Sequence, residues 1–190
     1  ELSPLDLYVT GQELDILLEA NIAVAQSLRM PAMVINRDWK IHHINSESLA
    51  LYNLSPGDIK QIPAKQLNAI NLIFDPNLPL YSNLIGNHPS WLRMARQTIY
   101  GFKIANQLCQ FESWYKELVN EWMLLPEFEY HWGSVRIDLP FSEDVSTYQS
   151  SKSILLDTTV PSMNTEATLR PLTISVGYFQ FDFPQIIAFT

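Results

Sequence analysis

Three basic residues, Arg96, Lys103 and Arg136, lie in a stretch rich in tryptophan and phenylalanine that runs from Trp91 to Arg136. A cation beside a large apolar surface can hold an anionic group at the rim of an apolar cavity. Arg96 is the first candidate for this role, because it flanks the apolar side of the helix predicted around Trp91. The competing interpretation of each cation is an ordinary charge in contact with water. The chemistry that these residues indicate is binding.

Residue types that serve in catalysis or metal binding form no recognisable pattern. His42 and His43 are adjacent, so on a strand they point to opposite faces and cannot bind one ion together. A metal site that uses His88 or His131 lacks the expected ligand spacing, although His131 could act as a haem ligand. Cys109 has no basic pair nearby in the sequence, which favours an inert thiol over a nucleophile. We therefore predict no enzyme, no metal site and no cofactor.

The aromatic stretch is predicted to form three helices. Apolar residues recur three and four positions apart from Ser90 to Leu108, with basic and polar residues on the other side. A second amphipathic helix carries Trp114 and Leu125 on its apolar side. Leu125 precedes a proline and is therefore pushed away from helical dihedrals, so a third, short helix is predicted to start with Pro126 and to end at Gly133.

Four of the five tryptophans lie in this stretch and carry much of its apolar surface. One explanation is burial against a sheet, which contributes roughly 2 kcal/mol or more for each indole. The other is that some of these rings line a small-molecule cavity. The candidate ligand-binding residues are the three cations above together with Phe74, Trp91, Ala95, Phe102, Trp122, Phe128 and Trp132.

The order of residues in this stretch resembles a known family. The residues that carry the resemblance are Trp91, Ala95, Phe102, Lys103, Leu118, Glu121, Pro126, Glu127, Phe128, Trp132 and Val135. They resemble the ligand-binding domain of the MmyB-like transcription regulators, over a range from about Met30 to the C-terminus. Pro126 replaces a small polar residue of the family pattern, and Lys103 replaces an arginine. Lysine keeps the charge but lacks the planar fork that holds a carboxylate through two hydrogen bonds.

The resemblance implies a PAS-like fold behind a helix-turn-helix DNA-binding domain, in a cytoplasmic regulator that senses a small, apolar, fatty-acid-like molecule. No helix-turn-helix is visible in these 190 residues, which start at Glu1 without a methionine. We therefore expect the sensor part of a longer protein, which contacts DNA only through a domain absent from this chain. We also expect a homodimer.

The first part of the chain predicts a helix and a hairpin. Apolar residues repeat at three and four positions from Gly11 to Leu28, which predicts a helix that caps the domain, connects it to a DNA-binding domain, or both. Apolar runs at Ala32 to Ile35 and Lys40 to Ile44 flank a polar turn and predict a β-hairpin. Asn45 or Ser46 can then cap a helix that extends through Leu54.

The segment from Ser55 to Ser90 is interrupted by prolines, and a helix is predicted only across Lys65 to Phe74. Such a segment can be a pocket wall or an inert crossing. Four later runs are rich in β-forming residues: Ser134 to Leu139, Ile154 to Leu156, Leu172 to Phe181 and Gln185 to Phe189. The intervening ranges, Phe141 to Ser153 and Thr158 to Arg170, are predicted to be polar loops.

These elements predict an α+β, PAS-like fold, with an antiparallel sheet of five or six strands covered by helices. Residues 1–29 form its connector helix and residues 30–190 its ligand-binding domain. Along the run from Leu172 to Phe181, apolar side chains alternate between the two faces of the strand. Each face of the sheet therefore needs a cover. Helices would cover one face, and the N-terminal helix or a second subunit would cover the other.

Composition restricts the function further. Twenty acidic and twelve basic residues give a formal charge of −8, which repels a phosphate backbone. One cysteine excludes an intrachain disulfide and fits a reducing compartment. The apolar runs are too short to span a membrane. We therefore predict a cytoplasmic domain that senses a fatty-acid-like ligand. The alternative is a ligand-free PAS-like module for dimerisation or protein interaction.

Overall fold

The computed structural model describes residues 10–86, 88–137, 156–159, 166–169, 171–174 and 183–189. The helices in these ranges are α1 (Gly11–Ser27), α2 (Ser46–Leu51), α3 (Pro56–Gln61), α4 (Ala69–Phe74), α5 (Pro79–Ile85), α6 (His88–Ala105), α7 (Ser113–Trp122) and α8 (Phe128–Ser134). The strands are β1 (Ala32–Ile35), β2 (Ile41–Ile44), β3 (Leu156–Thr159), β4 (Glu166–Leu169), β5 (Pro171–Ile174) and β6 (Gln185–Phe189). A short 3-10 helix, η2 (Gln107–Cys109), lies between α6 and α7.

The strands of the main sheet lie in the order β2-β1-β6-β5, and all neighbouring pairs are antiparallel. β3 and β4 pair with each other in a separate two-stranded sheet. The mixture of helices and antiparallel sheet confirms the predicted α+β class. The described residues do not form one sheet of five or six strands, because the two additional strands pair apart from the main four.

The predicted hairpin is confirmed, with β1 and β2 paired between Met33 and Ile44. Asn45 caps α2 as predicted, since its side chain accepts a hydrogen bond from the Ser48 amide at 3.0 Å. α2 ends earlier than the predicted limit of Leu54.

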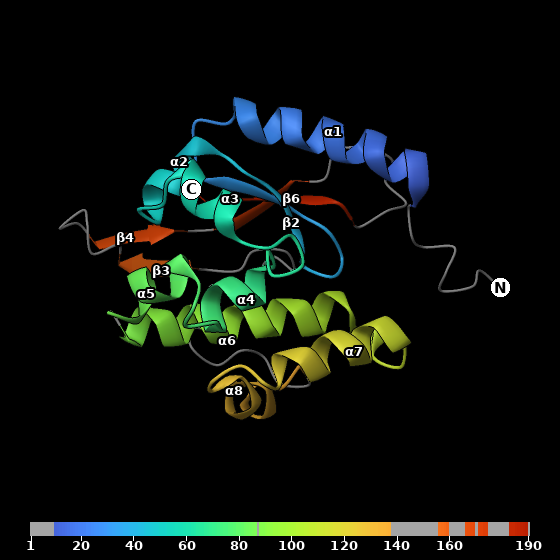
Figure 1. Ribbon diagram of the computed structural model, residues 1–190, viewed down its shortest axis with the longest axis vertical. Helices are drawn as coiled ribbons and strands as arrows, with labels where there is room; N and C mark the ends of the chain where they lie inside the picture. Colours follow the sequence, from blue (N-terminus) through green and yellow to red (C-terminus); the bar gives the residue numbers. More distant parts are fainter. Residues whose placement is uncertain are drawn as a thin grey trace.

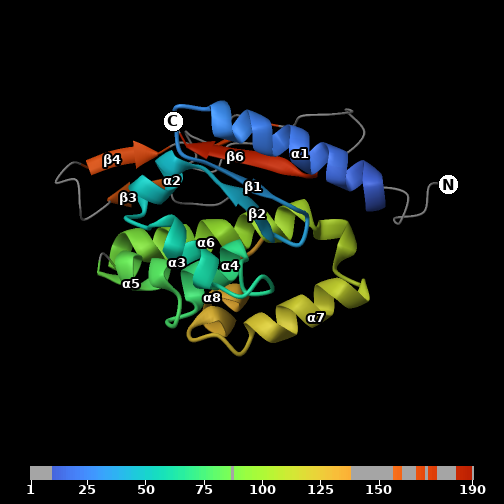
Figure 2. The same ribbon diagram turned by 45° about the horizontal axis from the view of Figure 1, so that its top comes forward.

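The main sheet lies between two layers of helices (Figures 1 and 2). α1 crosses its outer face and contacts β1, β2 and β6. The buried apolar side chains between α1 and the sheet are small or β-branched, and they are Ala25 of α1 and Ala32, Val34, Ile186 and Ala188 of the strands. The expectation that both faces are covered is therefore confirmed for the outer face, where the N-terminal helix is the cover.

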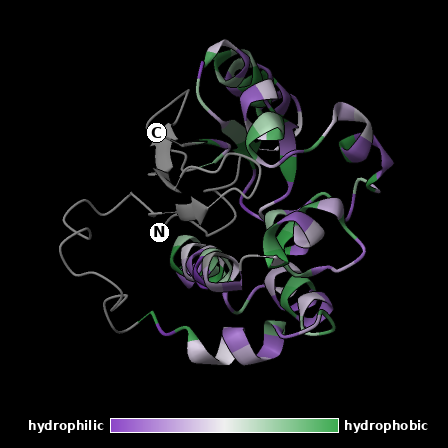
Figure 3. Ribbon diagram, turned by 90° about the vertical axis from the view of Figure 1, so that its left-hand side faces the viewer, coloured by the Kyte–Doolittle hydropathy of each residue, from purple (hydrophilic) through white to green (hydrophobic). Residues whose placement is uncertain are grey.

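The inner face looks toward the layer that contains α3 to α8 (Figure 2). α6 is the centre of this layer, and it contacts α4, α5 and α8. The helices of this layer carry apolar and polar residues, coloured green and purple in Figure 3. Helices that bury one side have this composition. A single large core joins this layer to the inner side of the sheet.

Three predictions about the helical layer need correction. The segment from 55 to 90 contains α3, α4 and α5 and the start of α6, so more of it is helical than the one helix predicted. Pro126 does not start α8: Glu127 is its N-cap, with a left-handed φ of 61°, and the helix ends at Ser134. The helix predicted from Ser90 to Leu108 is α6, which starts two residues and ends three residues earlier, and Leu125, predicted on the next helix, lies after the end of α7 at Trp122.

Two predictions about the later strands also need correction. Residues 134–137 form no strand, because α8 extends to Ser134, and the remainder of that predicted strand lies outside the described residues. The predicted loop from Thr158 to Arg170 contains β4. β6 is confirmed at its predicted bounds. β3 and β5 overlap the described part of their predicted runs, and residues 154–155 and 175–181 of these runs lie outside the described residues, as does the loop at 141–153.

Candidate functional site

A row of three apolar side chains crosses the inner face of the sheet: Ile44, Met33 and Ile187. Met33 is paired with Ile44 on β2 and with Ile187 on β6, so the three side chains share one face. All three pack against the large core yet remain partly exposed. Their neighbours on the outer face, such as Val34 and Ile186, have no exposed surface. We call these three residues the inner row.

Six of the seven apolar candidates, all except Trp132, are almost or completely buried, with exposed fractions of 0 to 1%. The aromatic rings of the candidates, including that of Trp132, contact one another in chains that join α4, α6, α7 and α8. The ring-centroid distances are 5.7 Å for Phe74–Trp91, 5.1 Å for Phe74–Phe128, 4.8 Å for Phe102–Trp122, 5.9 Å for Trp122–Phe128 and 5.5 Å for Phe128–Trp132. These contacts are those of a packed core, and contact of any of the rings with a ligand stays a prediction.

The three predicted cations occupy different surroundings. Lys103 donates from Nζ to the carbonyl oxygens of Trp132 at 2.6 Å and Val135 at 2.7 Å, and so caps the C-terminal end of α8. Burial lowers the pKa of Lys103 below its ordinary value. Arg96 is half-buried on α6 and lies close enough to His131 to affect its pKa, whereas Arg136 is exposed after α8. The three cations therefore differ in burial and in the groups that they contact.

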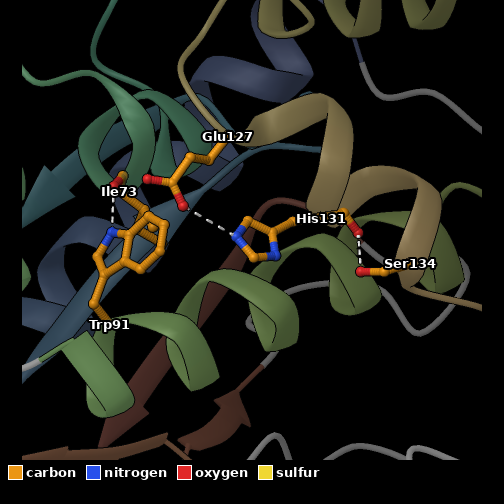
Figure 4. A network of polar contacts seen from close by, with 5 residues as sticks. All are labelled: Ile73, Trp91, Glu127, His131 and Ser134. Carbon is orange, nitrogen blue, oxygen red and sulfur yellow. Dashed lines mark hydrogen bonds and ion pairs between the residues drawn. The ribbon is translucent and has the colours of Figure 1, made fainter.

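His131, which the sequence indicates only as a residue that could act as a haem ligand, lies in the centre of the aromatic core. It is 4% exposed, and its ring lies 6.1 Å from Phe74 and 5.6 Å from Trp91. Figure 4 shows its Nε2 turned toward Glu127 Oε2, 3.7 Å away, which is too long for a hydrogen bond. Neither ring nitrogen has a hydrogen-bond partner among the described residues.

The surroundings of His131 favour its neutral form. Burial lowers its pKa most, Glu127 raises it, and Arg96 and His88 lower it. A neutral imidazole is compatible with the adjacent rings of Trp91 and Phe74. The indole N–H of Trp91 is satisfied separately, by the carbonyl oxygen of Ile73 at 2.9 Å (Figure 4).

Two cavities formed by the described residues lie outside the aromatic core. The smaller, of about 210 Å³, lies between β2 and the α2–α3 region and is lined by Ile41, His42, His43, Ile44, Leu49, Pro56, Ile59, Lys60 and Leu67. The larger, of about 650 Å³, is lined by Thr10, Leu14, Asn36, Arg37, Asp38, Glu112, Trp114, Glu117, Leu118 and Glu121. None of the ten predicted ligand-binding residues lines either cavity.

The residue types that bind metals are scattered over the part of the chain that the structure describes. No three histidine, cysteine, aspartate or glutamate side chains gather there in a way that could hold an ion. Cys109 is a buried thiol that forms no disulfide, and Arg37 Nη1 lies 3.6 Å from its sulfur. Across the same residues, every helix is too short or too polar to cross a bilayer.

Comparison with known proteins gives one family. A search of the curated proteins gives no match. The family model of the MmyB-like transcription regulator ligand binding domain matches residues 20–173, which run from the second half of α1 to β5. This match includes most of the chain and confirms the resemblance carried by the residues of α6, α7 and α8. The chain therefore belongs to the MmyB-like transcription regulator ligand-binding domain family, which is a family of regulator domains and not of enzymes.

Proposed function

We propose that this domain senses a small apolar acid, such as a fatty acid, which binds between the inner face of the sheet and the helical layer of a PAS-like fold. The inner row carries this proposal. Ile44, Met33 and Ile187 are apolar, lie on the covered face of the sheet and are partly exposed. An alkyl chain that covered them would remove apolar surface from water, at about 25 cal/mol per Å².

The acid group of the ligand would need a cation or several hydrogen-bond donors. We favour Arg96, because it extends from the central helix α6 and its guanidinium can form two parallel hydrogen bonds with a carboxylate. Lys103 is a weaker candidate, since two of its three N–H donors are directed at the carbonyl oxygens of Trp132 and Val135. Arg136 could reach a ligand only at the mouth of a site, because its side chain is exposed.

A ligand changes the activity of a regulator only if it binds two conformations unequally. We propose that α1 carries the change to a DNA-binding domain outside these residues, in a cytoplasmic homodimer. α1 lies on the outer face of the strands that bear the inner row, so a shift of these strands reaches it directly. Hydrogen exchange of α1 with and without fatty acid tests this route, and unchanged protection of α1 would contradict it.

Native mass spectrometry of the protein purified from cells tests the choice of ligand. The expected spectrum contains the mass of the domain with an added acyl mass, which dissociates on collisional activation and is identified as a fatty acid by its exact mass. A clean dimer with no added mass, unchanged after incubation with fatty acid, would contradict the sensor proposal. That result would favour the alternative, a dimerisation module without a ligand.

A further inference from the structure

The larger of the two cavities is a groove between the start of α1, the β1–β2 turn and one side of α7, and we call it the α1–α7 groove. The α7 residues in it are Trp114, Glu117, Leu118 and Glu121, whose spacing of three, four and seven positions places them on one side of the helix. Leu14 of α1 supplies another apolar wall. Its volume of about 650 Å³ is in the range of small-molecule sites.

The charge around the α1–α7 groove is strongly acidic. Its lining contains four carboxylates, from Asp38, Glu112, Glu117 and Glu121. Within the described ranges of the chain, none of the four forms an ion pair. A fatty acid would be repelled here, so this groove cannot serve the ligand of the proposed function.

Among the residues that the structure describes, Arg37 is the one basic residue that lines the groove. Its guanidinium lies 3.6 Å from the sulfur of Cys109 and 5.4 Å from the ring centroid of Phe183, and neither of these residues lines the groove. Arg37 therefore shares its positive charge with groups outside the groove, and the lining contains four carboxylates against this one guanidinium. The four carboxylates therefore determine the electrostatic character of the groove.

We propose that the α1–α7 groove binds a small organic ammonium ion with an apolar or aromatic body, as a second ligand of this domain. The half-buried indole of Trp114 can contact the cation through its ring face, and Leu14 and Leu118 can cover the apolar body. Glu117 and Glu121, one helical turn apart, supply the opposite charge. The site would join α1 to α7, so its occupation would be felt by the connector helix.

Calorimetric titration with phenethylamine and with phenylacetate tests this inference, because the two probes share a ring and differ in charge. We expect roughly millimolar binding of the amine and at least tenfold weaker binding of the acid. The double variant Glu117→Gln/Glu121→Gln should lose about tenfold in amine affinity. Glu129→Gln, which removes an exposed carboxylate of α8, is the matched control and should bind as the wild type does.

Equal affinity for the two probes, no amine binding at about ten millimolar, or full binding by the double variant would overturn the inference. The substituted glutamates are exposed, so the variants should fold, and circular dichroism checks this. An NMR shift of the Trp114 indole N–H locates the amine in the groove. Failure of this test leaves the fatty-acid proposal untouched, because the inner row lies elsewhere in the fold.

Discussion

Lys103 and Trp132 are joined twice in this domain. The ammonium nitrogen of Lys103 lies 2.6 Å from the carbonyl oxygen of Trp132 and 4.2 Å from the centroid of its indole ring. The first contact caps the C-terminal end of α8, and the second is a cation–π contact. Lys103, which replaces an arginine of the family pattern, therefore holds α6 and α8 together.

The first prediction concerns this cap. Lys103→Met should lower the free energy of unfolding by about 1–3 kcal/mol, because two carbonyl oxygens lose a charged donor. Urea denaturation measures the change. Lys116→Met, an exposed lysine of α7, is the control and should change stability by less than about 0.5 kcal/mol. Unchanged stability of Lys103→Met, with loss of fatty-acid affinity, would show that Lys103 serves the ligand and not the fold.

The second prediction concerns Trp91. Trp91→Phe preserves a ring in the core but leaves the carbonyl oxygen of Ile73 without its 2.9 Å hydrogen bond. We expect a loss of about 1–3 kcal/mol of unfolding free energy, measured by urea denaturation. Trp132→Phe should cost less, because its indole N–H has no hydrogen-bond partner in the described part of the chain. Equal effects of the two substitutions would contradict the role given to this hydrogen bond.

The third prediction concerns Asn45, which joins α1 to the sheet. Its amide nitrogen donates to the carbonyl oxygens of Ala25 and Met30, and its oxygen accepts from the amides of Ala32 and Ser48. Asn45→Asp would place a buried carboxylate against two carbonyl oxygens, at a cost of roughly 2–4 kcal/mol.

Hydrogen exchange provides the more specific measurement for Asn45. The end of α1 should lose protection in Asn45→Asp, because its link to β1 is broken. Asn53→Asp is the matched control, since the side chain of Asn53 is exposed. If α1 exchanged at the same rate in both variants, Asn45 could not be the link between α1 and the sheet.

The fourth prediction concerns pH. The pKa of His131 lies below its ordinary value of 6.5, chiefly because the ring is buried. Below about pH 6.5 the unfolded chain binds a proton at this position and the folded protein does not, so the free energy of unfolding should fall as the pH falls. His131→Gln should remove part of this fall.

Urea denaturation at pH 7.5, 6.5 and 5.5 measures this dependence. Part of it should persist in His131→Gln, because burial also lowers the pKa of His42 and of His43. His88→Gln removes an exposed imidazole and should change the pH dependence less than His131→Gln does, because His88 makes the smallest contribution to the lowered pKa of His131. An identical pH dependence in wild type and His131→Gln would refute the assignment.

Local patterns in the sequence were sufficient for much of the fold. α1 and α6 have apolar residues three and four positions apart, and the hairpin has two short apolar runs. In each case residues that are close in the sequence indicate both the type of element and its apolar side. α3 and α5 were missed although Pro56 and Pro79 occupy their first turns, where proline is favoured. The prolines of this segment were expected to interrupt helices, whereas Pro56 and Pro79 lie where two helices begin.

The candidate site was harder to predict, because its features depend on contacts between distant segments. Nothing near His131 in the sequence indicates that Phe74 and Trp91 enclose its ring. Trp39, outside the aromatic stretch, packs 6.1 Å from Phe102 and was not among the candidates. The partial exposure of the inner row depends on how the sheet and the helices pack against each other, and the periodicity of a sequence does not specify that packing.

The proposal that an alkyl chain covers the inner row is tested most directly by calorimetric titration with dodecanoate, below its micelle-forming concentration. Wild type should bind, and Met33→Glu should lose at least tenfold in affinity, because a carboxylate in the centre of the row repels the acid and leaves a charge against the alkyl chain. Ile16→Glu, on the exposed side of α1, should bind as the wild type does. Absence of binding by the wild type, or equal binding by Met33→Glu, would contradict the account.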